Sequence, residues 1–389
     1  MKIDFDQVIE RRNGDSIKWL QYGLQALPLW VADMDFAAPQ AVIRALQERA
    51  AHGVFGYPPV FGSPGELPEL RGVLIERMAR LYGWQVQAEE IVLLPGVVTG
   101  INLACHTLAD PGGSALVQTP VYPPFLSAAK NAGMTRQDSP LLPDADLSYQ
   151  IDWTGFEAAI TDQTRLFILC NPHNPVGRVF RRDELERMAE ICLRRGVPIC
   201  SDEIHCDLLY RGHQHIPMAS LSPEVARSTI TLMAPSKTFN IAGLQCSFAI
   251  IQNPNLRQAF QQAGQGLVGW VNVMGLVAGL AAYRHGQAWL EALLPYLQAN
   301  RDFLHQYVRE HLPGVKMGLP EGTYLAWLDC RQAGISGSPY DFFLKEARVA
   351  LNNGEAFGPG GEGFVRLNFG CPRATLVQAL EQMRAALKI

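Results

Sequence analysis

The strongest constraint on the fold is an alternation of apolar runs with helical patterns that begins near residue 90. The runs cover residues 91–94, 115–117, 166–170, 197–200, 230–233 and 248–251. Helical patterns separate them, and within residues 183–195 the side chains of Leu185, Met188 and Cys192 share one face. Strands that are apolar throughout and alternate with helices are typical of a mainly parallel sheet covered on both faces. Ligands of such sheets bind at the carboxyl ends of the strands, so the loops after these runs are the places to search.

The length of the chain and a change in pattern at both ends of this region predict two lobes. With 389 residues, the chain exceeds the usual size of one domain. Beyond about residue 285 we expect one long helix, two strands and a closing helix, over residues 290–308, 324–328, 364–369 and 375–387. We therefore expect a large α/β domain over residues 47–284 and a smaller α+β domain formed by residues 1–46 together with 285–389.

Composition and charge argue against several classes of protein. Apolar residues make up 48% and charged residues 18% of the chain, which is typical of a globular protein with a sizeable core. The formal net charge of −4 gives no reason to expect nucleic acid or an anionic membrane as a partner. No stretch approaches the ~18 consecutive apolar residues of a membrane span. Acidic side chains occur where a signal peptide needs an apolar run, so we expect a cytoplasmic protein.

The spacing of cysteine and histidine predicts neither a disulfide framework nor a metal site. The eight cysteines include no CxxC pair, and most lie in or beside apolar runs, as small buried hydrophobes do. The nine histidines lack metal-ligand spacing, although His213 and His215 follow His205 closely. Free, scattered cysteines are the usual pattern of a reducing compartment.

One lysine, Lys237, follows the apolar run that ends at residue 233. Most lysines extend their ammonium group to the surface from a loop. Alternatively, a lysine at the end of a buried strand is held in a site that lowers its pKa and makes it a nucleophile. The stretch around Lys237 leaves both interpretations open.

Three other loops carry residues suited to binding a charged ligand. Gly96, Val97 and Val98 lie between the first run and a helix, where backbone N–H groups can bind phosphate, although glycine-rich turns of this kind are common. Asn174 lies in a loop with two prolines, and Asp202 follows the run at 197–200. A buried acid there needs a partner, which is either a structural salt bridge or a protonated ring nitrogen of a cofactor. Together with Lys237, these are the parts that hold pyridoxal phosphate.

Three motifs resemble a known superfamily. They are Asn171-Pro172-His173-Asn174-Pro175-Val176-Gly177, Ser201-Asp202-Glu203-Ile204-His205 and Ser236-Lys237-Thr238-Phe239-Asn240. They closely resemble the aspartate-aminotransferase-like, fold-type I enzymes that use pyridoxal 5′-phosphate. Residues 30–36, His205 and residues 364–370 look most similar to the PatB/MalY-type cysteine–sulfur lyases of that superfamily. The match covers nearly the whole chain and implies a large domain with a mainly parallel mixed sheet flanked by helices, plus a smaller α+β domain.

The resemblance implies roles for the residues around the cofactor. Lys237 would form a Schiff base with pyridoxal phosphate and later act as the proton-transfer base. Asp202 would keep the pyridine nitrogen protonated, and Asn174 would bind the ring hydroxyl. His205 stands where many relatives have tyrosine for the same task. Tyr122 would stack on the ring, although a tyrosine of the core is the simpler interpretation. The other expected cofactor contacts are Gly96, Val97, Val98, Ile204 and Ser236.

The resemblance also implies substrate contacts and a shared site. Arg366 would bind the carboxylate of an amino-acid substrate, because its planar fork matches two oxygens. Ala32, Asp33 and Asn174 are the other expected substrate contacts. Tyr57 is expected to reach the cofactor phosphate of a neighbouring subunit, which implies a homodimer with two-fold symmetry and shared active sites.

One position departs from the broader superfamily. Many aminotransferases have an arginine eight residues after the lysine to pair with the phosphate, whereas this chain has Gln245. The lyase subgroup also commonly lacks that arginine. The substitution therefore does not argue against the cofactor, but it weakens the case for an ordinary aminotransferase.

The predicted function is β-elimination from L-cysteine S-conjugates such as L-cystathionine, which yields a thiol, pyruvate and ammonia. The main alternative is an aminotransferase of amino acids, because the same residues serve both reactions. A lower-ranked alternative is a regulatory partner protein that retains pyridoxal phosphate. The identity of the group on sulfur is left open.

Overall fold

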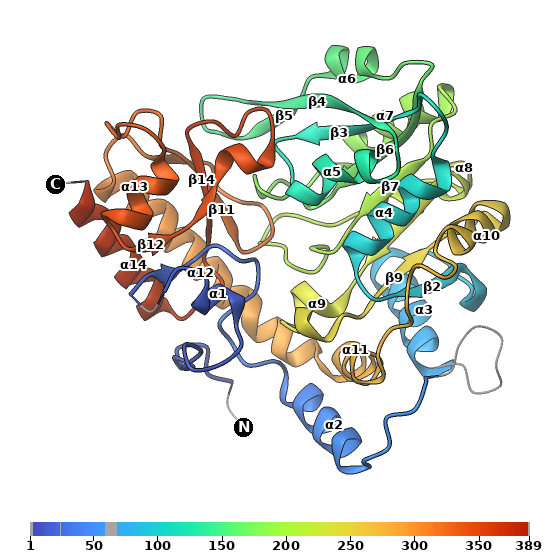
Figure 1. The fold of residues 1–389 in the computed structure, drawn as a ribbon, viewed down its shortest axis with the longest axis horizontal. Coiled ribbons are helices and arrows are strands. Elements are labelled where there is room, and N and C mark those ends of the chain that lie inside the picture. Colours follow the sequence, from blue (N-terminus) through green and yellow to red (C-terminus); the bar gives the residue numbers. More distant parts are fainter. Residues whose placement is uncertain (1–2, 24, 59–67, 388–389) are drawn as a thin grey trace.

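The computed structural model describes residues 3–23, 25–58 and 68–387. Its main feature is an eight-stranded sheet with the order β2-β9-β8-β7-β6-β3-β4-β5 (Figure 1). The strands are β2 (Ile91–Leu94), β3 (Ser114–Thr119), β4 (Thr135–Pro143), β5 (Tyr149–Ile151), β6 (Thr164–Cys170), β7 (Ile199–Asp202), β8 (Thr229–Met233) and β9 (Ser247–Ile250). The run from β4 to β8 is parallel, whereas β9 is antiparallel to both β2 and β8, and β5 to β4. The predicted mainly parallel α/β sheet is confirmed.

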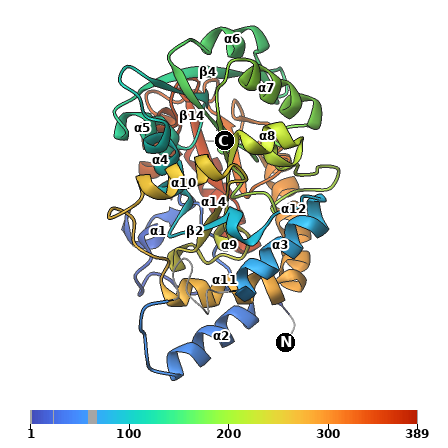
Figure 2. The same cartoon turned by 90° about the vertical axis from the view of Figure 1, so that its right-hand side faces the viewer.

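Helices cover both faces of this sheet, as the apolar strands predicted. Successive residues of β6 point to opposite faces, so Leu166 and Ile168 join one core cluster while Phe167 and Leu169 join another. Helices α4, α5 and α10 lie over the first face, and α7 and α8 over the second (Figure 2). The helices of this region are α3 (Pro68–Tyr82), α4 (Val97–Leu108), α5 (Pro123–Asn131), α6 (Trp153–Ala159), α7 (Arg182–Arg194), α8 (Pro223–Arg227), α9 (Pro235–Thr238), α10 (Pro254–Ala263) and α11 (Val273–His285), with 3-10 turns η1 (Ala88–Glu90), η2 (Met218–Ser220) and η3 (Ala242–Leu244).

The C-terminal region forms a second, antiparallel sheet with the order β10-β11-β14-β13. It lies beside the large sheet, with α9 between the two regions (Figure 1). Its strands are β10 (Lys316–Met317), β11 (Leu325–Asp329), β13 (Asn352–Asn353) and β14 (Phe364–Asn368), and its other elements are α12 (Gln287–His311), α13 (Pro339–Lys345), η4 (Gly354–Phe357) and α14 (Arg373–Ala386). The smaller α+β sheet predicted for this part of the chain is confirmed.

The N-terminal segment packs against the C-terminal region rather than against the large sheet. Phe5 and Phe36 pack against Trp289 of α12 in one core cluster. The short strand β1 (Leu27–Pro28) pairs in parallel with β12 (Val349–Ala350). The same segment contains α1 (Ile17–Leu20) and α2 (Gln40–Ala51). Helix α2 runs across residue 46 and packs on α11, and the predicted domain boundaries stay a prediction.

The differences between the predicted and observed strands have simple physical causes. β4 was not predicted, because five of its nine residues are exposed and it forms no apolar run. β7 ends at Asp202 rather than at residue 200, so the predicted loop acid is the last residue of the strand. Of the described residues, no helix is long and apolar enough to cross a membrane. All eight cysteines are buried and free.

Candidate active site

A cavity of about 400 Å³ lies at the carboxyl ends of the parallel strands, where the sequence predicted it. Most of the predicted site residues line it: Ala32, Gly96, Val97, Val98, Tyr122, Asn174, Asp202, Ile204, His205, Ser236 and Lys237. They come from six separate stretches of the chain. Because parallel strands end at the same edge of the sheet, residues far apart in sequence meet there. Three predicted residues, Arg366, Asp33 and Tyr57, do not line this cavity.

Lys237 extends into the cavity rather than to the outer surface. It lies on the single turn α9, directly after the fully buried strand β8. Its Nζ donates a hydrogen bond of 2.6 Å to the carbonyl oxygen of Ala32. Burial, together with the positive charge of Arg366, lowers the pKa of the Lys237 amine to about 8. The interpretation of Lys237 as an ordinary surface lysine is therefore wrong.

Asp202 is a buried acid that lacks a cationic partner among the described residues. Its side chain is 4% exposed, and Oδ1 accepts a hydrogen bond of 3.0 Å from Ile204 N–H. Burial raises the pKa of Asp202 to about 7, since this position gives the carboxylate little solvation. The sequence had left open that Asp202 forms a structural salt bridge. Within residues 3–23, 25–58 and 68–387, Asp202 forms no ion pair. A positively charged group in the cavity would stabilise the ionised form.

His205 is also buried, and it is neutral. Burial, together with the charges of Lys237 and Arg366, lowers its pKa to about 3. Its Nδ1 atom has no hydrogen-bond partner within the described part of the chain. Because an unpaired buried nitrogen is unfavourable, this atom is suited to a polar group of a bound ligand.

The opposite end of the cavity combines a helix N-terminus with hydroxyl groups. Gly96 precedes α4, a helix of twelve residues whose first turn presents Val97 and Val98 to the cavity. Ser236 lines the same cavity. The N–H groups of a first helical turn have no partner within the helix and favour an anion. The lining residues include no arginine, and Gln245 is among them.

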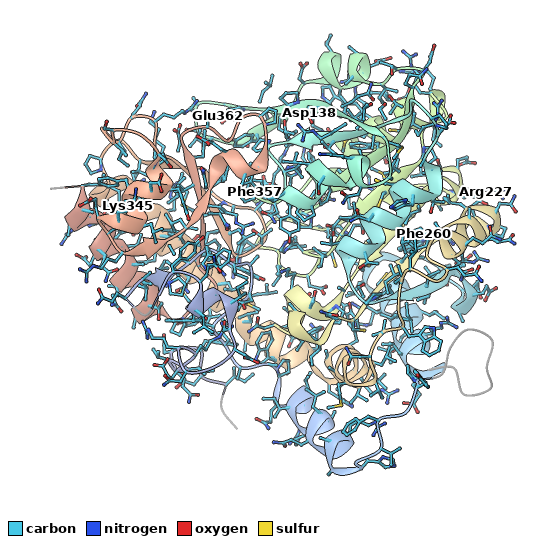
Figure 3. All side chains as sticks on the ribbon, in the orientation of Figure 1. Asp138, Arg227, Phe260, Lys345, Phe357 and Glu362 are labelled. Carbon is cyan, nitrogen blue, oxygen red and sulfur yellow. The ribbon has the colours of Figure 1, made fainter. Side chains whose placement is uncertain are left out.

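Arg366 lies beside the cavity as a buried cation surrounded by neutral acceptors. It is 3% exposed, and its two terminal nitrogens donate to Asn174 Oδ1 at 2.9 Å, Trp30 O at 2.9 Å and Asn352 Oδ1 at 2.5 Å. Its guanidinium lies 5.0 Å from the ring of Phe357, and Figure 3 labels Phe357 in the region between the two sheets. Burial lowers the pKa of Arg366 to about 10. Among the described residues no carboxylate pairs with it, so an anionic substrate group would supply the missing charge.

Asn174 and Tyr122 are fixed to each other through the backbone. Tyr122 N–H donates to Asn174 O at 3.1 Å, and the side chain of Asn174 accepts from Arg366. The loop of residues 171–177 thereby holds the ring of Tyr122 and the amide of Asn174 at the cavity, and the guanidinium of Arg366 beside it. Tyr122 is partly buried and lines the cavity, as the ring-stacking prediction requires.

The segment of residues 30–36 forms the wall facing Lys237, but Asp33 does not point its charge into the cavity. The carboxylate of Asp33 pairs with Arg11 at 3.0 Å and with Lys18 at 3.4 Å. Lys18 is fully buried and also pairs with Asp35 at 2.7 Å. The prediction that Asp33 is a substrate contact stays a prediction, and its carboxylate also fixes the wall to which Ala32 belongs.

Tyr57 does not line the cavity of its own chain. It is 89% exposed, and its ring contacts the edge of Trp270 at 5.3 Å. Trp270 is itself 56% exposed, and Val54, Phe55 and Leu267 are exposed in the same two segments of the chain. This placement agrees with a residue that acts on a neighbouring subunit, and it excludes contact with the cavity of its own chain.

The sequence analysis missed several residues of the site. Ser247 lines the cavity and donates to Leu94 O at 3.0 Å, but it begins the antiparallel strand β9, and only loops after strands had been searched. Thr99 lines the cavity one turn into α4. Asn352 holds Arg366 from a strand of two residues, too short to give a pattern. Asn240 was within a quoted motif, and it fixes the wall through hydrogen bonds with Met34 and Phe36.

Comparisons with known proteins agree with this geometry. The chain matches the profile of the family "Aminotransferase class I and II" over residues 26–383. It is 42% identical to cystathionine beta-lyase PatB of Bacillus subtilis (strain 168) over 394 residues, covering 99% of this chain and 100% of that protein. Among solved structures, that of OvoB has 46% identity and a TM-score of 0.93, with 99% of each chain covered.

A third comparison concerns the cofactor. The structure of cystalysin from Treponema denticola, which contains pyridoxal 5′-phosphate, has 33% identity and a TM-score of 0.93, and the match covers 100% of this chain and 99% of that one. The resemblance drawn from the sequence motifs is thus confirmed over the whole chain. The chain belongs to the aminotransferase class I and II family, in the part of it that contains the PatB-type cystathionine β-lyases.

Proposed function

We propose that this chain is a carbon–sulfur β-lyase that uses pyridoxal 5′-phosphate to cleave L-cysteine S-conjugates such as L-cystathionine. The observation that carries the proposal is the set of charged groups that are buried without ion-pair partners in and beside the cavity. Among the described residues Asp202 has no cationic partner and Arg366 no anionic one, and the amine of Lys237 is partly deprotonated near neutral pH. The similarity to PatB, a cystathionine β-lyase, supports the choice of reaction.

The residues of the cavity fit pyridoxal phosphate. Asp202 would hold the protonated ring nitrogen, and the unpaired Nδ1 of His205 is suited to the ring hydroxyl, together with Asn174. The first turn of α4 and Ser236 would hold the phosphate. Tyr122 would lie against the ring. The group would be bound through Lys237, and when bound it supplies an electron sink for charge that develops at the substrate Cα.

The chain's own residues account for the remaining steps. Arg366 would bind and orient the substrate carboxylate, for which its position beside the cavity and its lack of an anionic partner are suited. Lys237, freed from the cofactor, would take the proton from Cα, because its lowered pKa leaves a neutral amine available. The Cβ–S bond then breaks and the thiolate leaves. The released enamine hydrolyses, so one thioether and one water molecule give a thiol, pyruvate and ammonia.

We also propose that the protein acts as a homodimer in the cytoplasm. Tyr57 is exposed, and two-fold symmetry would bring it to the phosphate end of the partner's cavity. The exposed apolar residues Val54, Phe55, Leu267 and Trp270 would lie in the same interface. Eight buried free cysteines support a reducing compartment.

The first prediction concerns the reaction. Protein loaded with pyridoxal phosphate is expected to convert L-cystathionine to homocysteine, pyruvate and ammonia in equal amounts, without an added keto acid. Free thiol and pyruvate are measured in the same sample. If amino groups were instead exchanged only when a keto acid was supplied, and no thiol appeared, the protein would be an aminotransferase. The products cysteine and 2-oxobutyrate would also contradict cleavage at Cβ.

The second prediction concerns Lys237 in the protein without cofactor. Labelling of Lys237 by a small amine-reactive reagent should rise with pH and reach half its maximum near pH 8, because only the neutral amine reacts and burial lowers its pKa to about 8. Mass spectrometry gives the extent of labelling relative to the exposed Lys345. Since Arg366 lowers this pKa, Arg366→Gln should move the midpoint upward. A midpoint near the ordinary value of 10.5 in the unaltered protein would refute the assigned environment.

The third prediction concerns substrate binding by Arg366. Arg366→Lys keeps the charge but loses the planar fork, so KM for cystathionine should rise roughly 10-fold to 100-fold, the range expected for a lost hydrogen bond between charged groups. Steady-state kinetics measures the change. Arg331→Lys is the matched control, because Arg331 pairs with Asp329 at the surface and should leave KM unaltered. Equal KM values for Arg366→Lys and the unaltered protein would exclude Arg366 from carboxylate binding.

The fourth prediction concerns the proposed dimer. Tyr57→Phe should weaken cofactor binding roughly 10-fold, because it removes one hydrogen bond to a charged group and keeps the ring on Trp270. Tyr307→Phe removes a hydroxyl that donates to Glu381 instead, and it should have no such effect. Mixing Tyr57→Phe with Lys237→Ala protein should create dimers with one intact site, and recover activity and tight binding at that site. No recovery on mixing, with subunit exchange verified, would show that Tyr57 does not act across the interface.

A further inference from the structure

Lys237 lies on a helix that is too short to fix its own orientation. Helix α9 has four residues, and the hydrogen bond from Phe239 N–H to Pro235 O closes its single turn. A single helical turn is unfavourable in isolation, because several dihedral angles are fixed for one hydrogen bond. Contacts from other parts of the fold must therefore determine where the Lys237 side chain points.

One such contact joins the residue after the lysine to a buried acid. Thr238 is fully buried, and its hydroxyl donates a hydrogen bond of 2.9 Å to Asp207 Oδ2. Asp207 follows His205 by two residues, in a turn where Leu208 N–H donates to His205 O at 2.9 Å. The carboxylate of Asp207 thus connects the helix that carries Lys237 with the turn that carries His205.

The second oxygen of Asp207 binds a cation from a third element. Asp207 Oδ1 forms an ion pair with Arg77 of α3, and both side chains are 6% exposed. The guanidinium of Arg77 also lies 5.1 Å from the ring of Tyr283 on α11. Desolvation of two buried charges cancels much of their attraction, so a pair of this kind is weak evidence for stability. Because Asp207 binds both Arg77 and Thr238 and its side chain is only 6% exposed, it is suited to holding α9 in one orientation.

We propose that Asp207, held by Arg77, is a positioning residue that sets the direction of Lys237 relative to His205 through Thr238. The inference rests on the proposed role of Lys237 in the lyase reaction. Lys237 must first bind the cofactor and then reach the substrate Cα, so a small rotation of α9 would misplace the amine for both tasks. A displacement of about 1 Å at a reacting group can reduce a rate by roughly 100-fold. Neither Asp207 nor Arg77 touches the cavity.

Thr238→Val tests the proposal with little change in side-chain volume, because it keeps the branched side chain and removes only the hydroxyl. We expect kcat for thioether cleavage to fall at least 10-fold with little change in KM, since Arg366 is outside the network. The visible circular dichroism of the bound cofactor, measured without substrate, should also change, because it reports the orientation of the group on Lys237. Thr238→Ser, which restores a hydroxyl, should recover both values.

Thr229→Val is the matched control. Thr229 is a fully buried threonine at the start of β8, and its hydroxyl donates to Val225 O at 2.7 Å. This variant loses a buried threonine hydroxyl that donates to a backbone carbonyl rather than to a carboxylate, at the opposite end of the strand that leads to Lys237. It should therefore keep the kcat and the circular dichroism of the unaltered protein. Identical values for Thr238→Val and Thr229→Val, or a failure of Thr238→Ser to restore them, would overturn the proposal.

One further variant, together with the circular dichroism measured without substrate, makes the outcome decisive. Arg77→Lys retains the charge but loses the planar fork, so it should change kcat and circular dichroism in the same direction as Thr238→Val and by less; no change in either would count against the network. Circular dichroism is recorded without substrate. A protein that cleaved no thioether would refute the lyase reaction, while a changed signal in Thr238→Val alone would still support the positioning role.

Discussion

The site depends on one constraint, which is that charged groups in and beside the cavity are buried without ion-pair partners among the described residues. Asp202 ends β7, Lys237 follows β8, and Arg366 lies on β14 of the second sheet. Placing a charge in such a position is unfavourable unless a ligand compensates it. A cofactor with a cationic ring nitrogen and a substrate with a carboxylate would compensate Asp202 and Arg366. The ligands that suit this site therefore follow from the opposite charges that Asp202 and Arg366 lack among the described residues.

The two sheets are brought together by the N-terminal segment. Residues 30–36 receive hydrogen bonds from Asn368 on the small sheet, to Val31 O and Asp33 O, and from Asn240 near the lysine. Tyr324 donates to Ala32 O, the same oxygen that binds Lys237, at 2.7 Å. The buried ion pair between Lys18 and Asp35 also holds this segment in place. Residues 30–36 have little regular structure, yet they lie between Lys237, the predicted base, and Arg366, the predicted carboxylate site. They therefore determine the distance between these two residues.

Much of this site could be predicted from the sequence, because the residues that form it follow apolar runs along the chain. The alternation of runs predicted the sheet, and the sheet predicted that Gly96, Asn174, Asp202 and Lys237 would meet. The ion pairs of Asp33 with Arg11 and Lys18 could not be predicted, because no sequence pattern links these three residues. Ser247 was missed because β9 reverses direction, which an apolar run alone does not indicate. The network of Arg77, Asp207 and Thr238 joins residues that are 130 and 31 positions apart along the chain, so only the folded structure shows it.

The most direct test of the account is to locate the lysine that binds the cofactor. The protein is loaded with pyridoxal phosphate, reduced with borohydride so that the linkage becomes permanent, digested and analysed by mass spectrometry. The account predicts that the label is on Lys237, at one group per chain, and that Lys237→Ala protein is unlabelled at the site. A label on any other lysine, or an equal yield from Lys237→Ala protein, would contradict it.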